Sequence, residues 1–158
     1  MDEKIRAAVL IISDTRSSED DVSGKLLDEL LGSAGFSAER TIVSDEKDSI
    51  IAELEGLSDS GIGLIITTGG TGLSPRDNTP EATMAVIERE APGIAEAMRR
   101  ETFSKTQMAM LSRGICGIRG GTLIINLPGS PKAVEECFEV IRPVLRHAVD
   151  LLGGVSDH

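Results

Sequence analysis

The chain has 158 residues, a length that one domain with a sizeable hydrophobic core can account for. Acidic side chains outnumber basic ones by 26 to 16, and the formal net charge of −10 excludes a general surface for nucleic acid or anionic membranes. Trp and Tyr are absent and Phe occurs three times, so the stacking platforms of a single-stranded nucleic-acid binder are missing. We expect a single domain over residues 1–158 that binds small molecules, with no nucleic acid and no membrane as partner.

The cysteines and the N-terminal residues indicate a cytoplasmic protein. Cys116 and Cys137 form no CxxC motif, and two buried reduced thiols are favoured over a disulfide. The apolar run within residues 1–13 is too short for a signal peptide or a membrane span.

The first half of the chain alternates predicted strands with predicted helices. Residues 7–13 and 63–68 are short apolar runs without polar alternation, which is typical of strands buried on both faces, and 39–44 is a further predicted strand. Leucine and isoleucine recur at helical spacing over residues 23–35 and 48–57, which predicts a helix after each of the first two strands.

The second half continues this alternation. Helices are predicted over residues 79–90, with Thr79 as N-cap, and over 94–103. Residues 114–130 predict a short strand, a Gly-Gly turn and a core strand, and a long helix follows from 131 to about 152. This pattern predicts an α/β fold whose mostly parallel sheet is covered by helices on both faces.

Three predicted strands end directly in polar or glycine-rich loops, namely residues 13–16, 69–72 and 128–130. Ligands bind beyond the carboxyl ends of parallel strands, so we expect these loops to meet at one edge of the sheet. The GGTG sequence at 69–72 allows backbone N–H groups to point into one anion-binding concavity. The alternative is a tight connection that merely requires positive φ angles. Neither the P-loop pattern GxxxxGK[ST] nor the dinucleotide pattern GxGxxG occurs.

Acidic residues follow the same strands. Asp77 either stabilises the turn before a helix or binds Mg²⁺, a hard cation that takes one or two carboxylates together with phosphate oxygens. Its neighbour Arg76 either pairs with Asp77 or binds a phosphate. Asp45 is either a helix N-cap or a second carboxylate of that site, and Ser13 and Asp14 either form a simple turn or contact the ligand. Together these residues predict a site for a phosphorylated small molecule, such as a nucleotide with Mg²⁺.

Glycines also surround further polar residues in the second half. Arg119 in a turn is ordinarily solvated, but glycines on both sides indicate close approach of the backbone to a ligand. Ser130 is expected to begin the last helix, whose N-terminus is either a plain cap or another anion site.

Several motifs occur in one order along the chain: SDT (13–15), DVSG (21–24), TTGGTG (67–72), RDNTPEA (76–82), the segment 110–137 with LSR, GIRGG and LPGSP, and HAVDLL (147–152). Over nearly its whole length the chain thereby closely resembles the MogA/MoaB family of molybdopterin-binding proteins. The related G domains of gephyrin and of the plant molybdenum-cofactor protein share this resemblance.

The resemblance implies a three-layer α/β/α sandwich with a mostly parallel sheet, the molybdopterin-binding fold, in a homo-oligomer that is a trimer or possibly a hexamer. It implies an adenylyltransferase that joins the AMP part of the co-substrate ATP to the terminal phosphate of molybdopterin, releases pyrophosphate and requires Mg²⁺. The alternative within the same pathway is a protein that binds molybdopterin or a precursor without catalysis.

Residue by residue, the resemblance implies that Asp77 and Asp45 are catalytic and bind Mg²⁺, and that Ser112 contacts the pterin. Many family members have proline before the second of these aspartates, whereas this chain has Ser44. The other candidate residues for substrate or nucleotide binding are Ser13, Asp14, Gly69, Gly70, Thr71, Gly72, Arg76, Arg119, Pro128, Gly129 and Ser130.

Overall fold

The structure, a computed structural model, describes residues 3–17 and 19–155. Its elements in chain order are β1 (Ile5–Ile12), α1 (Val22–Ser33), β2 (Phe36–Val43), α2 (Lys47–Asp59), β3 (Leu64–Thr68), α3 (Thr79–Val86), β4 (Arg89–Glu90), α4 (Pro92–Thr102), the short 3₁₀ helix η1 (Gln107–Leu111), β5 (Cys116–Arg119), β6 (Thr122–Leu127) and α5 (Pro131–Leu152).

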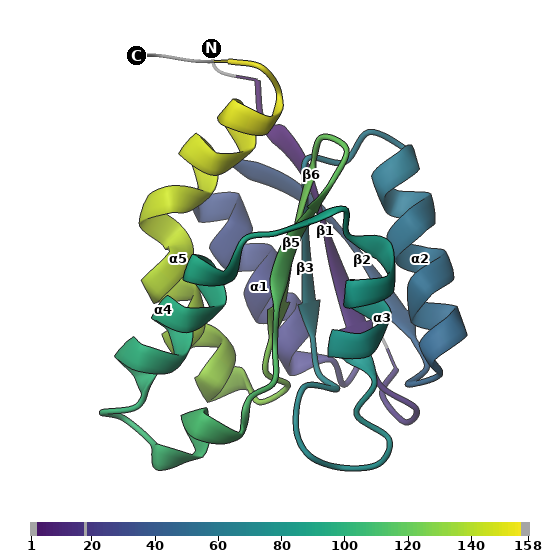
Figure 1. Ribbon diagram of the computed structural model, residues 1–158, viewed down its shortest axis with the longest axis vertical. Coiled ribbons are helices and arrows are strands. Elements are labelled where there is room, and N and C mark those ends of the chain that lie inside the picture. The colour runs from purple at the N-terminus through teal and green to yellow at the C-terminus, as the bar shows by residue number, and fades with distance from the viewer. Residues whose placement is uncertain (1–2, 18, 156–158) are drawn as a thin grey trace.

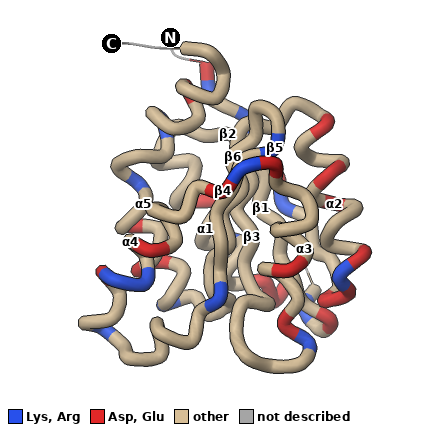
Figure 2. The backbone as a smooth tube through the Cα atoms, in the orientation of Figure 1, with Lys and Arg blue, Asp and Glu red and all other residues tan. Residues whose placement is uncertain are grey.

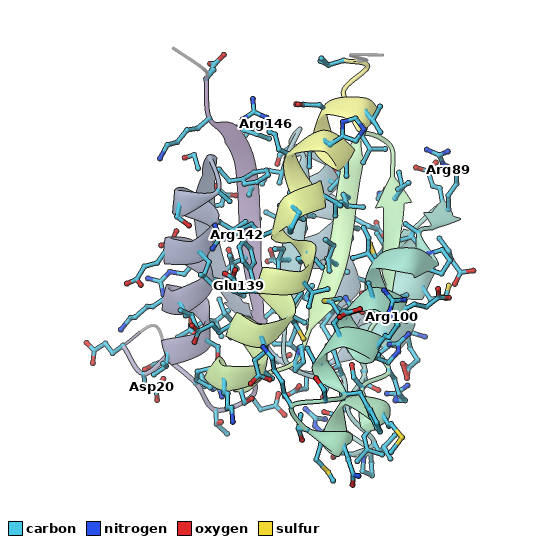
Figure 3. The ribbon with its side chains drawn as sticks, turned by 90° about the vertical axis from the view of Figure 1, so that its left-hand side faces the viewer. Asp20, Arg89, Arg100, Glu139, Arg142 and Arg146 are labelled. Carbon is cyan, nitrogen blue, oxygen red and sulfur yellow. The ribbon has the colours of Figure 1, made fainter. Side chains whose placement is uncertain are left out.

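The strands form one sheet in the order β2-β1-β3-β6-β5-β4. β1, β2, β3 and β6 run parallel, whereas β5 is antiparallel to both of its neighbours. Helices α1, α4 and α5 cover one face of the sheet and α2 and α3 cover the other (Figure 1). Figure 3 shows α5 lying between α1 and α4. The predicted three-layer α/β/α fold with a mostly parallel sheet is therefore confirmed.

The hydrophobic core lies on both faces of the central strands. Val9, Ile66 and Ile125 belong to the cluster beneath α1, α4 and α5, while Leu10 and Ile65 belong to the cluster beneath α2 and α3. Neighbouring side chains of a strand point to opposite faces, so a strand covered on both sides needs a continuous apolar run. This is why the sequence of these strands shows no polar alternation.

The helix predicted over residues 79–90 is shorter in the structure. α3 ends at Val86, and the chain then becomes extended to form the edge strand β4. The Glu88 N–H donates to Ile118 O at 2.7 Å, and the Ala91 N–H donates to Cys116 O at 2.9 Å. These hydrogen bonds to β5 replace the helical hydrogen bonds that the local sequence favours. The helix therefore ends early because of tertiary contacts with a distant strand.

The start of α3 also differs from the prediction. Asn78 holds the N-cap position, and Thr79 is the first helical residue. The Thr79 hydroxyl donates to Gly69 O at 3.0 Å instead of capping the helix, so it ties α3 to the loop after β3. Throughout the described residues, we find no helix with the length and apolar character needed to cross a membrane.

Candidate functional site

Loops meet at the end of the sheet where the parallel strands finish (Figure 1). Gly69, directly after β3, donates its backbone N–H to Leu127 O at 3.1 Å. The loop after β6 packs on it, because a Cβ added to Gly129 would lie 3.3 Å from Gly69 Cα. The predicted meeting of the 69–72 and 128–130 loops is confirmed.

The first two positions of the GGTG loop have no room for side chains. Gly69 has a φ of 100°, and a Cβ there would lie 2.6 Å from Ile12 O. Gly70 has a φ of 69°, and a Cβ there would lie 2.3 Å from Thr79 Oγ1. Glycine is the residue that adopts positive φ without steric cost, so the loop is packed between the end of β1 and the start of α3.

Asp77 lies beside this loop. A Cβ added to Gly72 would be 2.9 Å from Asp77 Oδ2, and the same oxygen accepts the Ser74 N–H at 3.0 Å. Within the described part of the chain, the backbone N–H groups of residues 70–72 have no protein acceptor. Successive free amides form an anion-binding nest. The loop therefore presents hydrogen-bond donors for an anion next to a carboxylate, while a catalytic role of Asp77 remains a prediction.

Asp14 and Asp45 form a reciprocal pair after β1 and β2. The Asp14 N–H donates to Asp45 Oδ2 at 3.0 Å, and the Asp45 N–H donates to Asp14 Oδ1 at 2.9 Å. Arg76 forms ion pairs with Asp14 and, at 2.9 Å, with Glu46. Two alternatives from the sequence are thereby corrected: Glu46, not Asp45, holds the N-cap position of α2, and Arg76 pairs with Asp14 rather than with Asp77.

The pKa values of the two carboxylates of this pair are shifted in opposite directions. The Asp45 N–H and the Arg76 guanidinium hold the pKa of Asp14 below its ordinary value. The pKa of Asp45 lies above its ordinary value, first because burial disfavours the charged form and second because Asp14 is negatively charged. A cation bound near Asp45 would therefore favour its ionised form.

The carboxylates suit Mg²⁺, the metal that the family resemblance implies. Asn78 Nδ2 donates to Asp45 O at 3.1 Å, which brings the segment of Asp77 next to Asp45. Among the described residues, no group of three His, Cys, Asp or Glu side chains forms a complete metal cage. Mg²⁺ takes one or two carboxylates and completes its shell with water and substrate phosphates. The oxygen donors therefore match Mg²⁺ that arrives with a phosphate.

A pocket of about 410 Å³ opens on the α4–α5 side of the same loops. Its wall contains Thr71, Ser112, Pro128 and Ser130 of the predicted set, together with apolar side chains such as Met98. This volume falls in the range of pockets that bind small organic ligands. The carboxylates described above lie outside the pocket wall, toward α2 and α3, so the GGTG loop separates an organic pocket from an acidic site.

Two of the predicted serines already have protein partners. Ser13 Oγ accepts the backbone N–H groups of Thr15 and Arg16 at 3.2 and 3.1 Å, which is a local turn. Ser130 Oγ accepts the Ala133 N–H at 3.2 Å and so caps α5. The structural alternatives for both serines are thus present, and Ser130 also lines the pocket.

Arg119 lies apart from the other predicted residues, at the opposite end of the sheet. It pairs with Thr122 at the start of β6, and its Nη1 donates to Val86 O at 3.1 Å. Asp59, at the end of α2, is its ion-pair partner at 4.0 Å. Gly120 and Gly121, which follow Arg119, form the turn between β5 and β6, where Gly120 has a φ of 56°, whereas Gly117 lies within β5. The prediction failed because β5 runs antiparallel and ends away from the loops.

Comparison with known proteins identifies the family. A family profile described as "Probable molybdopterin binding domain" matches residues 8–147, which is most of the chain. The chain belongs to this family. The resemblance inferred from the sequence motifs is therefore confirmed.

Members of the molybdopterin-binding-domain family match this chain over nearly its full length. "Molybdopterin adenylyltransferase" from Helicobacter pylori is 42% identical over 158 residues, which cover 95% of this chain and 89% of that protein. "Molybdenum cofactor synthesis protein cinnamon" from Drosophila melanogaster is 49% identical over 156 residues. That match covers 96% of this chain and 26% of the Drosophila protein, so the chain spans about a quarter of that relative's length. The solved molybdopterin biosynthesis Mog protein from Mycobacterium ulcerans superposes with a TM-score of 0.88 at 42% identity, covering 96% of this chain and 99% of that one.

In this molybdopterin-binding domain, one arginine absent from the predicted set contacts the site. Arg113 donates its backbone N–H to Thr71 O and its Nε to Gly72 O, both at 2.8 Å. Its Nη2 donates to Asp77 O at 2.8 Å, and its Nη1 pairs with Glu81 at 2.6 Å. The LSR motif draws attention to this residue in the sequence. The hydrogen-bond partners of Arg113, however, lie more than 30 positions away, so the spacing of residues along the chain does not predict them.

A buried amide is the second residue missed. Asn126 Nδ2 donates to the hydroxyls of Thr67 and Thr83, both at 3.0 Å, and Asn126 Oδ1 accepts the Ile115 N–H at 3.1 Å. It therefore ties β6 to β3, to α3 and to the segment before β5. The sequence contains a signal for this role, because Asn126 is an amide within the otherwise apolar strand sequence TLIINL. A polar side chain that is buried requires hydrogen-bond partners.

Proposed function

We propose that the chain is a molybdopterin adenylyltransferase that uses ATP and Mg²⁺. One observation supports this proposal most directly: the amides of residues 70–72 have no protein acceptor among the described residues, Gly72 of this loop lies beside the Asp77 carboxylate, and Thr71 of the same loop lines the organic pocket. This reaction requires three parts: hydrogen-bond donors to phosphate oxygens, a carboxylate that binds the metal, and a pocket for an organic ring system. The Helicobacter relative with that name supports the proposal, since it matches 95% of the chain.

In this reaction an oxygen of the terminal phosphate of molybdopterin attacks the α-phosphorus of ATP. The bond between the α-phosphorus and the oxygen that bridges to the β-phosphate breaks, and pyrophosphate leaves. No covalent bond to the enzyme forms, so catalysis depends on positioning and on stabilising negative charge. When bound, Mg²⁺ would neutralise part of the phosphate charge.

The residues of the chain divide these tasks. The amides of residues 70–72 donate to phosphate oxygens as negative charge develops. Asp77 and Asp45 would hold Mg²⁺, and Arg76 keeps Asp14 paired so that the Asp14–Asp45 contact persists. Ser112 holds the pterin within the 410 Å³ pocket.

Turnover with molybdopterin and Mg-ATP, followed as adenylylated pterin, tests the proposal. Asp77→Asn keeps an oxygen that accepts the Ser74 N–H but removes the negative charge, so we expect the fold to persist and transfer to be lost. Wild-type turnover by this variant would refute the assigned role. Tight binding of molybdopterin without ATP consumption by the wild type would instead favour the binding-only alternative.

We further propose a homo-oligomer, a trimer or hexamer, in the cytoplasm. An apolar groove between α4 and α5 includes Ile94, Val140, Val144 and Leu151, and the last two are exposed. A face of this kind suits contact with a second copy of the chain. Both cysteines are buried free thiols, which is compatible with a reducing compartment. Light scattering at a mass three or six times that of the 16.7-kDa chain would support the assembly.

A further inference from the structure

We propose that Arg113 is a positioning residue that holds the segment 72–77 in place relative to the organic pocket; its effect on turnover rests on the function proposed above. The guanidinium donates to Gly72 O and to Asp77 O, which are the two ends of this segment. One planar group therefore spans the segment and sets the separation of its ends. Arginine is suited to this role because its donors have a rigid geometry, whereas lysine presents a single flexible ammonium group.

The segment depends on this arginine because it contains few other anchors. Residues 72–75 carry no charged side chain, and Figure 2 shows most of the loop between β3 and α3 without charged residues. Leu73 is exposed. Within the segment, the Asp77 N–H donates to Ser74 O at 2.9 Å, the Asp77 carboxylate accepts the Ser74 N–H at 3.0 Å, and the Arg76 N–H donates to Ser74 Oγ at 3.4 Å. These bonds shape the turn. Arg76 attaches the segment near its second end, through its ion pairs with Asp14 and Glu46, whereas Arg113 bonds to both ends.

The neighbours of Arg113 connect it to the pocket. Ser112 lines the pocket, and Ser112 O and Gly114 O accept hydrogen bonds from Arg99 Nη1 at 3.3 and 2.8 Å. Arg99 belongs to α4 and lines the same pocket. Residues 112–114, here called the strip, are therefore bonded to Arg99 on the pocket side. Through Arg113 they are bonded to the segment that contains Asp77. A shift of this strip would move Ser112 and Asp77 together.

All nitrogens of the Arg113 guanidinium point at protein oxygens, including Glu81 Oε1 at 2.6 Å. We therefore assign Arg113 to positioning rather than to ligand contact. Displacement of a reacting or metal-binding group by about 1 Å typically costs around a hundredfold in rate. Arg113→Lys retains the positive charge near Glu81, but its single ammonium group cannot replace the two guanidinium nitrogens that donate to Gly72 O and Asp77 O. Its main effect should be a misplaced Asp77, not lost pterin affinity.

The test compares Arg113→Lys with two arginine controls. Arg100→Lys changes an exposed arginine of α4 that pairs with Glu101 (Figure 3), and Arg119→Lys changes the arginine at the far end of the sheet. Three quantities are measured for each protein: kcat for adenylyl transfer, the dissociation constant for molybdopterin, and the amide hydrogen exchange of peptides covering 69–78 and 122–127.

We expect Arg113→Lys to lower kcat roughly tenfold or more while molybdopterin affinity stays within about twofold. Exchange should become faster in 69–78 and stay unchanged in 122–127, and both controls should behave as wild type. Wild-type kcat and exchange in Arg113→Lys would overturn the proposal. A loss of molybdopterin affinity without faster exchange would also overturn it, because Arg113 would then be a ligand contact. If the wild type binds molybdopterin but transfers nothing, the proposed function fails, and faster exchange at unchanged affinity still establishes Arg113 as the anchor of the segment.

Discussion

Replacing Gly72 with alanine would test how closely function depends on the position of Asp77. Gly72 has no positive φ, so alanine can adopt its backbone conformation. The added Cβ, however, would lie 2.9 Å from Asp77 Oδ2, whereas ordinary contacts begin at 3.4 Å. The difference between these distances means that the carboxylate must retreat by about 0.5 Å.

The cost in stability should be small. Retreat of the carboxylate weakens one hydrogen bond, from the Ser74 N–H, and such a bond contributes about 1 kcal/mol. In a domain of this size about 1 kcal/mol corresponds to a fall in Tm of about 2–4 °C. The cost in activity should be larger, since reacting groups must be held within about 0.5 Å of the productive geometry. We expect kcat to fall about tenfold, between no effect and the roughly hundredfold effect of a 1 Å displacement.

The assay is steady-state adenylyl transfer at saturating ATP and molybdopterin, together with thermal unfolding of the same preparations. Gly56→Ala is the matched control, because Gly56 lies within α2 and an added Cβ there meets no atom within 4 Å. This control should keep full activity. Wild-type kcat in Gly72→Ala, with the control also unaffected, would show that the contact between Gly72 and Asp77 has no role in catalysis.

Two further predictions concern protonation and stability. Asp14→Asn removes the negative charge beside Asp45, so the pKa of Asp45 should fall. The acid limb of the pH profile of kcat/KM should then move to lower pH, because the role proposed for Asp45 requires its ionised form. An unmoved limb would exclude Asp45 as the group that titrates. Asn126→Leu leaves the Ile115 N–H without its acceptor and should lower the free energy of unfolding by about 1–3 kcal/mol in urea titrations at an unchanged m-value. A midpoint equal to that of the wild type would mean that another acceptor replaces Asn126.

Local patterns in the sequence predicted most of the fold. The long apolar runs gave β1, β3 and β6, and Pro131 after a serine cap marked the start of α5. Prediction failed where distant backbone decided the structure. Residues 88–90 have a helical composition but pair with β5, and no local signal shows that a neighbouring strand will take their hydrogen bonds.

The candidate site divides in the same way. Asp77 could be expected near Gly72 because it follows that glycine by five positions in the same loop, which the sequence shows. Arg119 was wrongly placed among the site residues because β5 runs antiparallel to β6. Glycines beside an arginine occur both in hairpin turns and in ligand-binding loops, so the sequence does not distinguish the two. Arg113 was missed because its guanidinium acts through carbonyl oxygens, and every residue has a carbonyl oxygen whatever its side chain.

The course of α5 leaves both ends of the domain on the side away from the pocket. This helix starts at Pro131 beside the pocket and, with 22 residues, carries the chain about 33 Å back along the sheet. There Val149 Cγ1 and Ile5 Cγ2 both lie near Gly63, at 3.0 and 3.3 Å from the Cβ position of that glycine. Longer polypeptides can therefore incorporate this module, joined at either end, without covering the pocket. The Drosophila relative, of which the matched segment is 26%, and a Chlorobaculum tepidum protein named bifunctional, of which it is 49%, have such extended architectures.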